Sequence, residues 1–395
     1  MKTKAAHTLI RKFTINPFLM MPILLSLAIT GCEFKGSDQS DFDMEQSETT
    51  PLPAVDEAKF ICAGGTEGTE ILEAEMRSAL SGSGSEYDFS YEIERADGRK
   101  FTFNYGESTP ETEYESASTS KMVTGIVILR LVQKGILQLS DKPQMYLPEW
   151  PVTPESPLYN MTLEHLLSFT SGLIEEPRCV NQGSAVFSEC VVAIANLNLG
   201  NGEVPGDEFN YSGTHMQVAG LMAIRALGKK DWTEVFEEFK AETGLFPSGR
   251  YDLPSASNPR LAGGMHWTGA EYLSFLRALR ADKILSKEMM ALYILDRTAS
   301  PVAIGNSPAR SGIGEDWHYG LGYWHECKSE VFNCESGKRI SSPGAYGAYP
   351  FWDREHDYVG MLSIQTNLGG FRYGTATLER LVTEKANAWA KCEKQ

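Results

Sequence analysis

The chain has 395 residues, of which 42% are hydrophobic and 22% are charged, values typical of a globular protein and unlike those of a wholly disordered one. Its formal net charge of −16 argues against nucleic acid as a partner, because the phosphate backbone would repel it. The length suits one large domain, or two lobes of a single catalytic unit.

The N-terminal segment has the layout of a secretory signal peptide. Basic residues come first, and an uncharged apolar stretch over residues 18–29 follows, which is short for a membrane span. The stretch ends at Leu27-Ala28-Ile29-Thr30-Gly31-Cys32, which resembles the lipobox of bacterial lipoproteins. We therefore expect residues 1–31 to be a signal peptide and Cys32 to carry lipid. A plain signal peptide with an incidental cysteine is the alternative.

The segment that follows is polar. Residues 32–58 are mostly Ser, Asp, Glu, Gln, Thr and Pro, a composition that cannot bury a core. It predicts a disordered acidic tether between the lipid and a folded domain over residues 59–395. The expected location is the bacterial cell envelope, and in a Gram-negative host the periplasmic side of the outer membrane.

Periodicity predicts the elements of the folded part in chain order. A helix is expected over residues 68–80, and strands over 87–93 and 100–105 are joined by the turn Ala96-Asp97-Gly98. Residues 121–135 are apolar on nearly every side, which is typical of a helix buried in the middle of a domain.

Helical patterns then dominate from residue 141 to about 255, with Gly and Pro loops between them. A helix over 270–280, strands near 321–324, 348–351 and 358–365, and a helix over 376–390 complete the chain. Strands therefore gather towards both ends. This order predicts an α/β lobe built from the two termini and a helical lobe inserted between them.

Cysteine usage predicts disulfides, because six cysteines besides Cys32 form an even set in an exported chain. Six cysteines allow 15 pairings, and the shortest separations are the simplest choice. Zinc is the alternative, but the sequence has no CxxC or HExxH spacing. The favoured pairs are Cys179–Cys190, Cys327–Cys334 and, joining the ends of the domain, Cys62–Cys392.

A hydroxyl and an amine stand three positions apart at the start of the apolar helix, in Ser118-Thr119-Ser120-Lys121. Side chains at i and i+3 share one helical face. Burial and the positive end of the helix dipole both favour a neutral Lys121, which could take the proton of Ser118. The tetrapeptide alone is also compatible with a helix-capping serine followed by a solvated lysine.

Further stretches strengthen the catalytic interpretation. In chain order they are His165–Leu173 (HLLSFTSGL), Phe209–Ser212 (FNYS), Asn258–Met265 (NPRLAGGM), Tyr319–Tyr323 (YGLGY) and Ser342–Tyr349 (SPGAYGAY). Together with Ser-x-x-Lys they resemble the ordered motifs of the penicillin-recognising serine hydrolases, which include class C β-lactamases, D,D-peptidases and related esterases. The resemblance runs from about residue 60 to 395. It implies a β-lactamase/transpeptidase-like fold, an antiparallel sheet flanked by helices from both chain ends, with an all-helical lobe over about 141–255.

The resemblance also implies roles. Ser118 would be the nucleophile, Lys121 its base, and Tyr211 a proton shuttle whose phenolate a neighbouring Lys⁺ would stabilise. The backbone N–H groups of Ser118 and Ala345 would hold the oxyanion. The family's reaction requires no metal or cofactor. A lone tyrosine such as Tyr211 is otherwise more often a packing residue.

Two departures bear on the substrate. Gly213 stands where the family usually has Asn, and Ser342-Pro343-Gly344 replaces Lys-Thr-Gly or His-x-Gly, unless Lys338 or Arg339 takes the cationic role. The chemistry of acylation is unaffected by either change. We therefore expect a small ester, or an amide without a free carboxylate, to be a better substrate than a β-lactam.

Other functions remain open from the sequence alone. A protein that binds penicillin or D-Ala peptides with low turnover, a β-lactamase, and a lipoprotein with a vestigial motif are the alternatives. The expected partners are a small-molecule or peptide substrate and, through the lipid, a membrane. His215 could line the cleft, although a histidine in this setting is more often structural.

Overall fold

The computed structural model describes residues 60–62, 66–200, 203–367 and 375–394, which all belong to the unit Glu57–Gln395. The predicted signal peptide, the predicted lipidation site at Cys32 and the predicted tether lie outside the described residues. None of the described helices combines the length and the apolar character that crossing a membrane would need.

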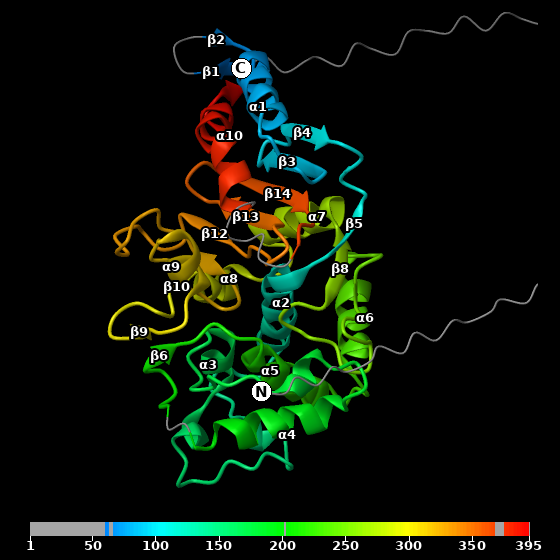
Figure 1. Ribbon diagram of the computed structural model, residues 1–395, viewed down its shortest axis with the longest axis vertical. Helices are drawn as coiled ribbons and strands as arrows, with labels where there is room; N and C mark the ends of the chain where they lie inside the picture. Colours follow the sequence, from blue (N-terminus) through cyan, green and yellow to red (C-terminus); the bar gives the residue numbers. More distant parts are fainter. Residues whose placement is uncertain (1–59, 63–65, 201–202, 368–374, 395) are drawn as a thin grey trace, which may run out of the picture. The chain divides into compact units, whose positions relative to one another are not determined.

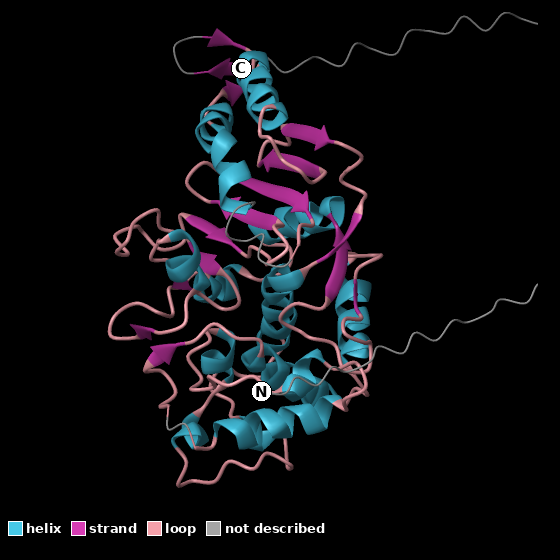
Figure 2. Ribbon diagram, viewed as in Figure 1, coloured by secondary structure: helices cyan, strands magenta, loops and turns pink. Residues whose placement is uncertain are grey.

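An antiparallel sheet of seven strands forms the larger layer, in the order β10-β11-β12-β13-β14-β3-β4. Its central pairing joins β14 to β3 over their whole length, with Leu362 opposite Tyr91, so both ends of the chain build one sheet (Figure 2). The strands are β3 Phe89–Arg95, β4 Lys100–Tyr105, β10 His318–Tyr319, β11 Trp324–His325, β12 Arg339–Ser341, β13 Tyr349–Asp353 and β14 Tyr358–Ile364.

Helices cover both faces of this sheet. Helix α1 (Glu70–Ser81) packs beside α10 (Thr375–Ala390) on one face, and α7 (Gly269–Arg280) packs on the other (Figure 1). Alternation along β3 explains the arrangement, because successive side chains of a strand point to opposite faces. Tyr91 lies in the core under α1 and α10, whereas Glu92 lies on the other face, beside α7.

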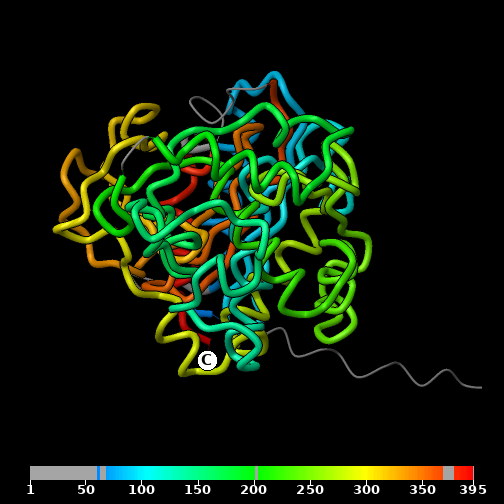
Figure 3. Tube along the Cα trace, turned by 90° about the horizontal axis from the view of Figure 1, so that it is seen from below, coloured from blue at the N-terminus to red at the C-terminus, as the bar shows by residue number. Residues whose placement is uncertain are grey.

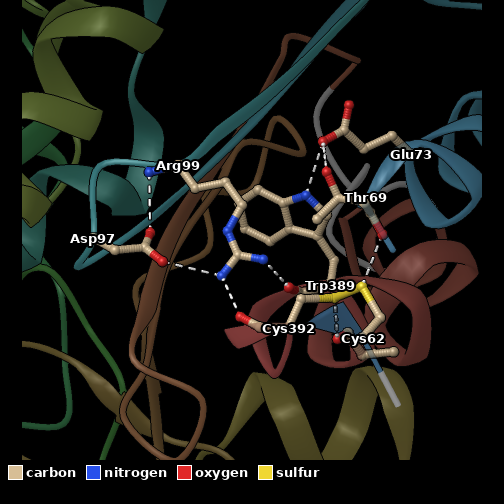
Figure 4. The surroundings of a disulfide bond; sticks show 9 residues. Cys62, Thr69, Glu73, Asp97, Arg99, Trp389 and Cys392 are labelled. Carbon is tan, nitrogen blue, oxygen red and sulfur yellow. Dashed lines mark hydrogen bonds and ion pairs between the residues drawn. A yellow bond between two sulfur atoms is a disulfide. The ribbon is translucent and has the colours of Figure 1, made fainter. Parts of the chain in front are cut away.

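The two ends of the domain are tied together. A small sheet places β1 (Phe60–Cys62) between β15 (Glu393–Lys394) and β2 (Thr66–Glu67), and a disulfide joins Cys62 to Cys392 (Figure 4). Arg99 binds the same corner, since its guanidinium donates hydrogen bonds to the carbonyls of Trp389 and Cys392. The chain ends are therefore held next to the outer helices of the sheet.

The middle of the chain forms a mainly helical part, seen from below in Figure 3. Two short strands also occur there, and both pair with strands later in the chain, β6 with β9 and β7 with β8. A disulfide between Cys179 and Cys190 joins η4 to α4. The elements are η2 Pro143–Met145, η3 Pro157–Asn160, α3 Leu163–Leu167, η4 Arg178–Asn181, α4 Phe187–Asn198, β6 Glu208–Phe209, α5 Thr214–Leu227, α6 Trp232–Thr243 and β7 Arg250–Tyr251.

The remaining elements connect the two parts. The third disulfide, Cys327–Cys334, closes a short loop after β11, so the six cysteines form the three pairs favoured from the sequence. The connecting elements are β5 Glu113–Glu115, η1 Ala117–Thr119, β8 Met265–Thr268, α8 Lys287–Tyr293, β9 Ala303–Ile304 and α9 Pro308–Ile313.

Helix α2 (Ser120–Gln133) lies between the sheet and the helical part (Figure 1), and nearly all its residues are buried. Gly125 allows the connection before β11 to approach it, because a Cβ there would lie 2.7 Å from the carbonyl oxygen of Leu321. Gly322, in the connecting segment, allows the same close approach, because a Cβ there would lie 2.7 Å from the carbonyl oxygen of Lys121. The start of α2 is thus fixed against the segment that leads into β11 of the sheet.

Candidate active site

Ser118 and Lys121 meet at the entrance of α2. Ser118 belongs to η1, the turn that leads into the helix, and is partly exposed, whereas Lys121 is only 5% exposed. The Lys121 Nζ lies 2.8 Å from the Oγ of Ser118 and donates a second hydrogen bond of 2.8 Å to the carbonyl of Ala262. The amine is therefore within proton-transfer distance of the hydroxyl.

The surroundings of Lys121 favour its neutral form. Burial lowers the pKa of its amine well below 10.5, and the positive charge of Arg260 lowers it further, while Glu176 acts in the opposite direction. A neutral amine has a lone pair that can accept the proton of Ser118. The geometry and the charge state thus agree with a base at this position.

The turn that carries Ser118 is held by the segment after β12. Ala117 has a φ of 43°, a left-handed conformation that is strained for a residue with a side chain. Ser342 donates a 3.0 Å hydrogen bond to the carbonyl of Ser118, and a Cβ on Gly344 would lie 2.7 Å from the carbonyl oxygen of Ser116. These close contacts explain why a small residue stands at position 344.

Tyr211 joins the pair, but its protonation state differs from the sequence-based expectation. The amine of Lys121 lies 4.6 Å from the centre of its ring. Burial raises the pKa of Tyr211 to about 12, although hydrogen bonds with Ser118 and Trp324 act to lower it. The predicted phenolate is therefore not supported, because the phenol loses hydration and the amine of Lys121, itself favoured in the neutral form, supplies no full positive charge to stabilise it. As a phenol, Tyr211 can relay or donate a proton.

The neighbours of Tyr211 fix its position. Its ring stacks on Trp324, with ring centres 5.0 Å apart. His215 lies one helical turn further on and is fully buried; its Nε2 is 2.7 Å from the carbonyl oxygen of Asn210, and its Nδ1 is 2.8 Å from the Oγ of Ser171. Burial lowers the pKa of His215 to about 4. The histidine therefore supports the tyrosine loop and does not face the cleft.

Gly213 marks a group of residues that the sequence did not reveal. Its backbone N–H donates a 2.9 Å hydrogen bond to Glu176, and Glu176 forms a 2.9 Å ion pair with Arg260. In the sequence, Arg260 lies within the stretch Asn258–Met265 and Glu176 lies three residues after Leu173, and neither position indicates that the two side chains meet. They come from segments 84 residues apart in the chain.

The other predicted substrate residues fall in a turn and not in a strand. Residues 342–348 connect β12 to β13, and the N–H of Gly344 already bonds the carbonyl of Ala348. Neither alternative cation reaches this turn. Lys338 is 45% exposed and lies near Glu335 and Glu355, and Arg339 is buried on Glu379. Lys338 precedes β12 and Arg339 begins it, so both come before the turn, and their side chains are engaged with these carboxylates.

Metal binding finds no support in the described part of the chain, where no group of three or more His, Cys, Asp or Glu side chains could hold an ion.

The fold is shared with known proteins. The family model described as Beta-lactamase matches residues 94–384, so the chain belongs to the beta-lactamase family. A candidate beta-lactamase from Bacteroides dorei DSM 17855 is 26% identical, with a TM-score of 0.65 over 81% of this chain and 99% of that one. EstCE1, a hydrolase with promiscuous acyltransferase activity, is 19% identical with a TM-score of 0.64 over the same shares, and shows the fold alone.

Curated relatives match over part of their length. Protein flp of Staphylococcus aureus (strain MW2) is 31% identical over 130 residues, which are 32% of this chain and about a quarter (26%) of that protein. Penicillin-binding protein 4* of Bacillus subtilis (strain 168) is 28% identical over 63% of this chain and 60% of its own length. Members of the family are hydrolases of several kinds.

Proposed function

We propose that the protein is a serine hydrolase that forms an acyl-enzyme on Ser118 with a small ester or amide. The observation that carries this proposal is the amine of Lys121, which lies 2.8 Å from the Ser118 hydroxyl and whose pKa is lowered by burial. A serine hydroxyl becomes a useful nucleophile only when a base of this kind takes its proton.

The proposed reaction uses each of these groups in turn. Lys121 takes the proton as Ser118 Oγ bonds to the carbonyl carbon, and the backbone N–H groups of Ser118 and Ala345 stabilise the oxyanion. The bond to the leaving group then breaks, and the leaving group receives a proton through Tyr211. Water attacks the acyl-enzyme, which releases the acid and restores Ser118.

The test uses the full chain in detergent beside Ser118→Ala. We expect p-nitrophenyl esters to be hydrolysed and a fluorescent phosphonate to label Ser118, with both signals absent in the variant. Failure of every ester, cephalosporin and D-Ala peptide to react, together with no labelling, would contradict the proposal. Labelling without turnover would favour the second candidate, a penicillin- or D-Ala-peptide-binding protein of low turnover. The altered residues Gly213 and Ser342 support that candidate.

We also propose export and lipid anchoring through Cys32, on the basis of the sequence pattern ending at that residue. Mass spectrometry of the chain from a bacterial membrane fraction is expected to find a lipidated N-terminal cysteine. A Cys32→Ser variant that still carries lipid would refute this assignment.

A further inference from the structure

The ion pair between Glu176 and Arg260, next to Gly213, is arranged in a way that suits binding of a substrate group by Arg260. Glu176 is saturated, since one carboxylate oxygen accepts from the Gly213 N–H and the other from Arg260 and Asn181. Arg260 is held at the same time by a 2.6 Å hydrogen bond to Asn181. Its guanidinium is therefore fixed in position, although its side chain remains 35% exposed.

The guanidinium lies close to the catalytic groups. Arg260 begins the tight turn whose Ala262 carbonyl binds Lys121, and the amides of Gly263 and Gly264 both donate to the Arg260 carbonyl. A Cβ on Gly213 would stand 2.8 Å from Glu176 Oε2 and 3.3 Å from two of the guanidinium nitrogens. The absence of a side chain at 213 therefore lets the Glu176–Arg260 ion pair lie directly against the backbone two positions after Tyr211.

The positive charge of Arg260 indicates which class of ligand this residue would bind. A guanidinium is a permanently charged group in proteins, whereas burial favours a neutral Lys121. Guanidinium offers five N–H donors in a planar fork, and the bonds to Glu176 and Asn181 use only part of them. A carboxylate fits the remaining donors best, because such charge-assisted bonds are about twice as strong as neutral ones.

We propose that Arg260, held by Glu176 and Asn181 against the backbone at Gly213, binds a carboxylate on the acyl part of the substrate. The subsite rests on the proposed function. It supplies from the side of Gly213 a cation that the segment 342–344 does not provide. The preferred substrates are then esters or amides of dicarboxylic or otherwise anionic acids, which revises the expectation of a substrate without a free carboxylate.

The experiment compares three esters with the full-length protein in detergent: p-nitrophenyl hexanoate, mono-p-nitrophenyl adipate and the terminal amide of that adipate. The measured quantity is the ratio of kcat/KM for the adipate to that for the hexanoate. We expect Arg260→Gln to lower this ratio about tenfold or more while hexanoate hydrolysis persists. Arg260→Lys, which keeps the charge but loses the fork, should lower it less.

A double variant serves as the matched control. Arg260→Gln alone leaves Glu176 unpaired, and its charge would itself repel the adipate. The Arg260→Gln/Glu176→Gln variant removes both charges, so we expect its ratio to lie above that of the single variant but to stay well below that of wild type. Glu176→Gln alone should raise the ratio, because it removes a competing carboxylate. Circular dichroism and thermal unfolding check that each variant is folded.

Several outcomes would overturn the subsite. They are an unchanged adipate-to-hexanoate ratio in Arg260→Gln and a wild-type ratio in the double variant. A third is an equal fall in kcat/KM for the adipate amide in Arg260→Gln, which would indicate that Arg260 recognises a neutral carbonyl. If wild type hydrolyses hexanoate through Ser118 in these cases, the proposed function still stands. If wild type hydrolyses none of the three esters and Ser118 is not labelled, the proposed function itself fails.

Discussion

Replacing Gly344 by alanine should displace the nucleophile. The new Cβ would lie 2.7 Å from the buried carbonyl oxygen of Ser116 and 3.2 Å from a methyl group of Thr119. Ordinary contacts of this kind begin near 3.4 Å, so the turn must move by about 0.7 Å, the difference between the two distances. Because a misplacement of about 1 Å can cost about 100-fold in rate, we expect kcat to fall roughly 10- to 100-fold.

The assay measures kcat, KM and the rate of phosphonate labelling of Ser118, together with thermal unfolding. Gly200→Ala is the matched control, since a Cβ at that glycine meets nothing within 4 Å. KM should change much less than kcat, because the displaced group reacts and does not bind. If Gly344→Ala keeps kcat within twofold of the control and unfolds at the same temperature, the contact between residues 344 and 116 does not position Ser118.

Three other predictions follow from the site and its support. Lys121→Met should reduce Ser118 acylation by at least about 100-fold without loss of folding, as seen by phosphonate labelling and circular dichroism; unfolding of this variant would instead show a structural lysine. In wild type, the rate of Ser118 acylation should rise with pH as Lys121 loses its proton, at a pKa below 10.5. Glu176→Gln should move that rise to lower pH, because Glu176 raises the pKa of Lys121. A pH–rate profile of labelling that moves to higher pH in this variant would contradict Lys121 as the base. Burial raises the pKa of Glu92 from 4.5 to about 7, so the stability contributed by its protonated form is lost as pH rises through this window. Glu92→Gln should therefore be more stable than wild type at pH 8 by up to about 3 kcal/mol, but not at pH 4. Equal urea midpoints of the two proteins at pH 8 would refute this.

The disulfide between Cys179 and Cys190 gives a further test, because η4 also carries Asn181. Replacing both cysteines by serine opens a loop with a sequence separation of 11 residues, which should cost about 3 kcal/mol in the free energy of unfolding. The adipate-to-hexanoate ratio should fall as well, since Asn181 then loses its anchor. A stability loss with an unchanged ratio would separate the disulfide from the subsite.

The sequence predicted the catalytic pair because both members lie within one helical turn, where spacing alone determines which side chains meet. The same local spacing of apolar and turn residues predicted the buried helix, the first hairpin and the final helix. It could not bring Glu176 to Arg260, because their approach depends on how segments far apart in the chain pack. Nor could it give the protonation state of Tyr211, which is set by burial among aromatic rings and not by residue type.

The corner where the chain ends meet has a topological consequence (Figure 4). The Cys62–Cys392 bond spans 330 positions, so nearly the whole domain is a closed covalent ring. A protease that cuts any one peptide bond inside this ring leaves a single molecule whose halves separate only after reduction. Such a nicked protein would migrate as intact on a non-reducing gel, and it could keep its packed sheet. Release of a segment from the ring would require a second cut.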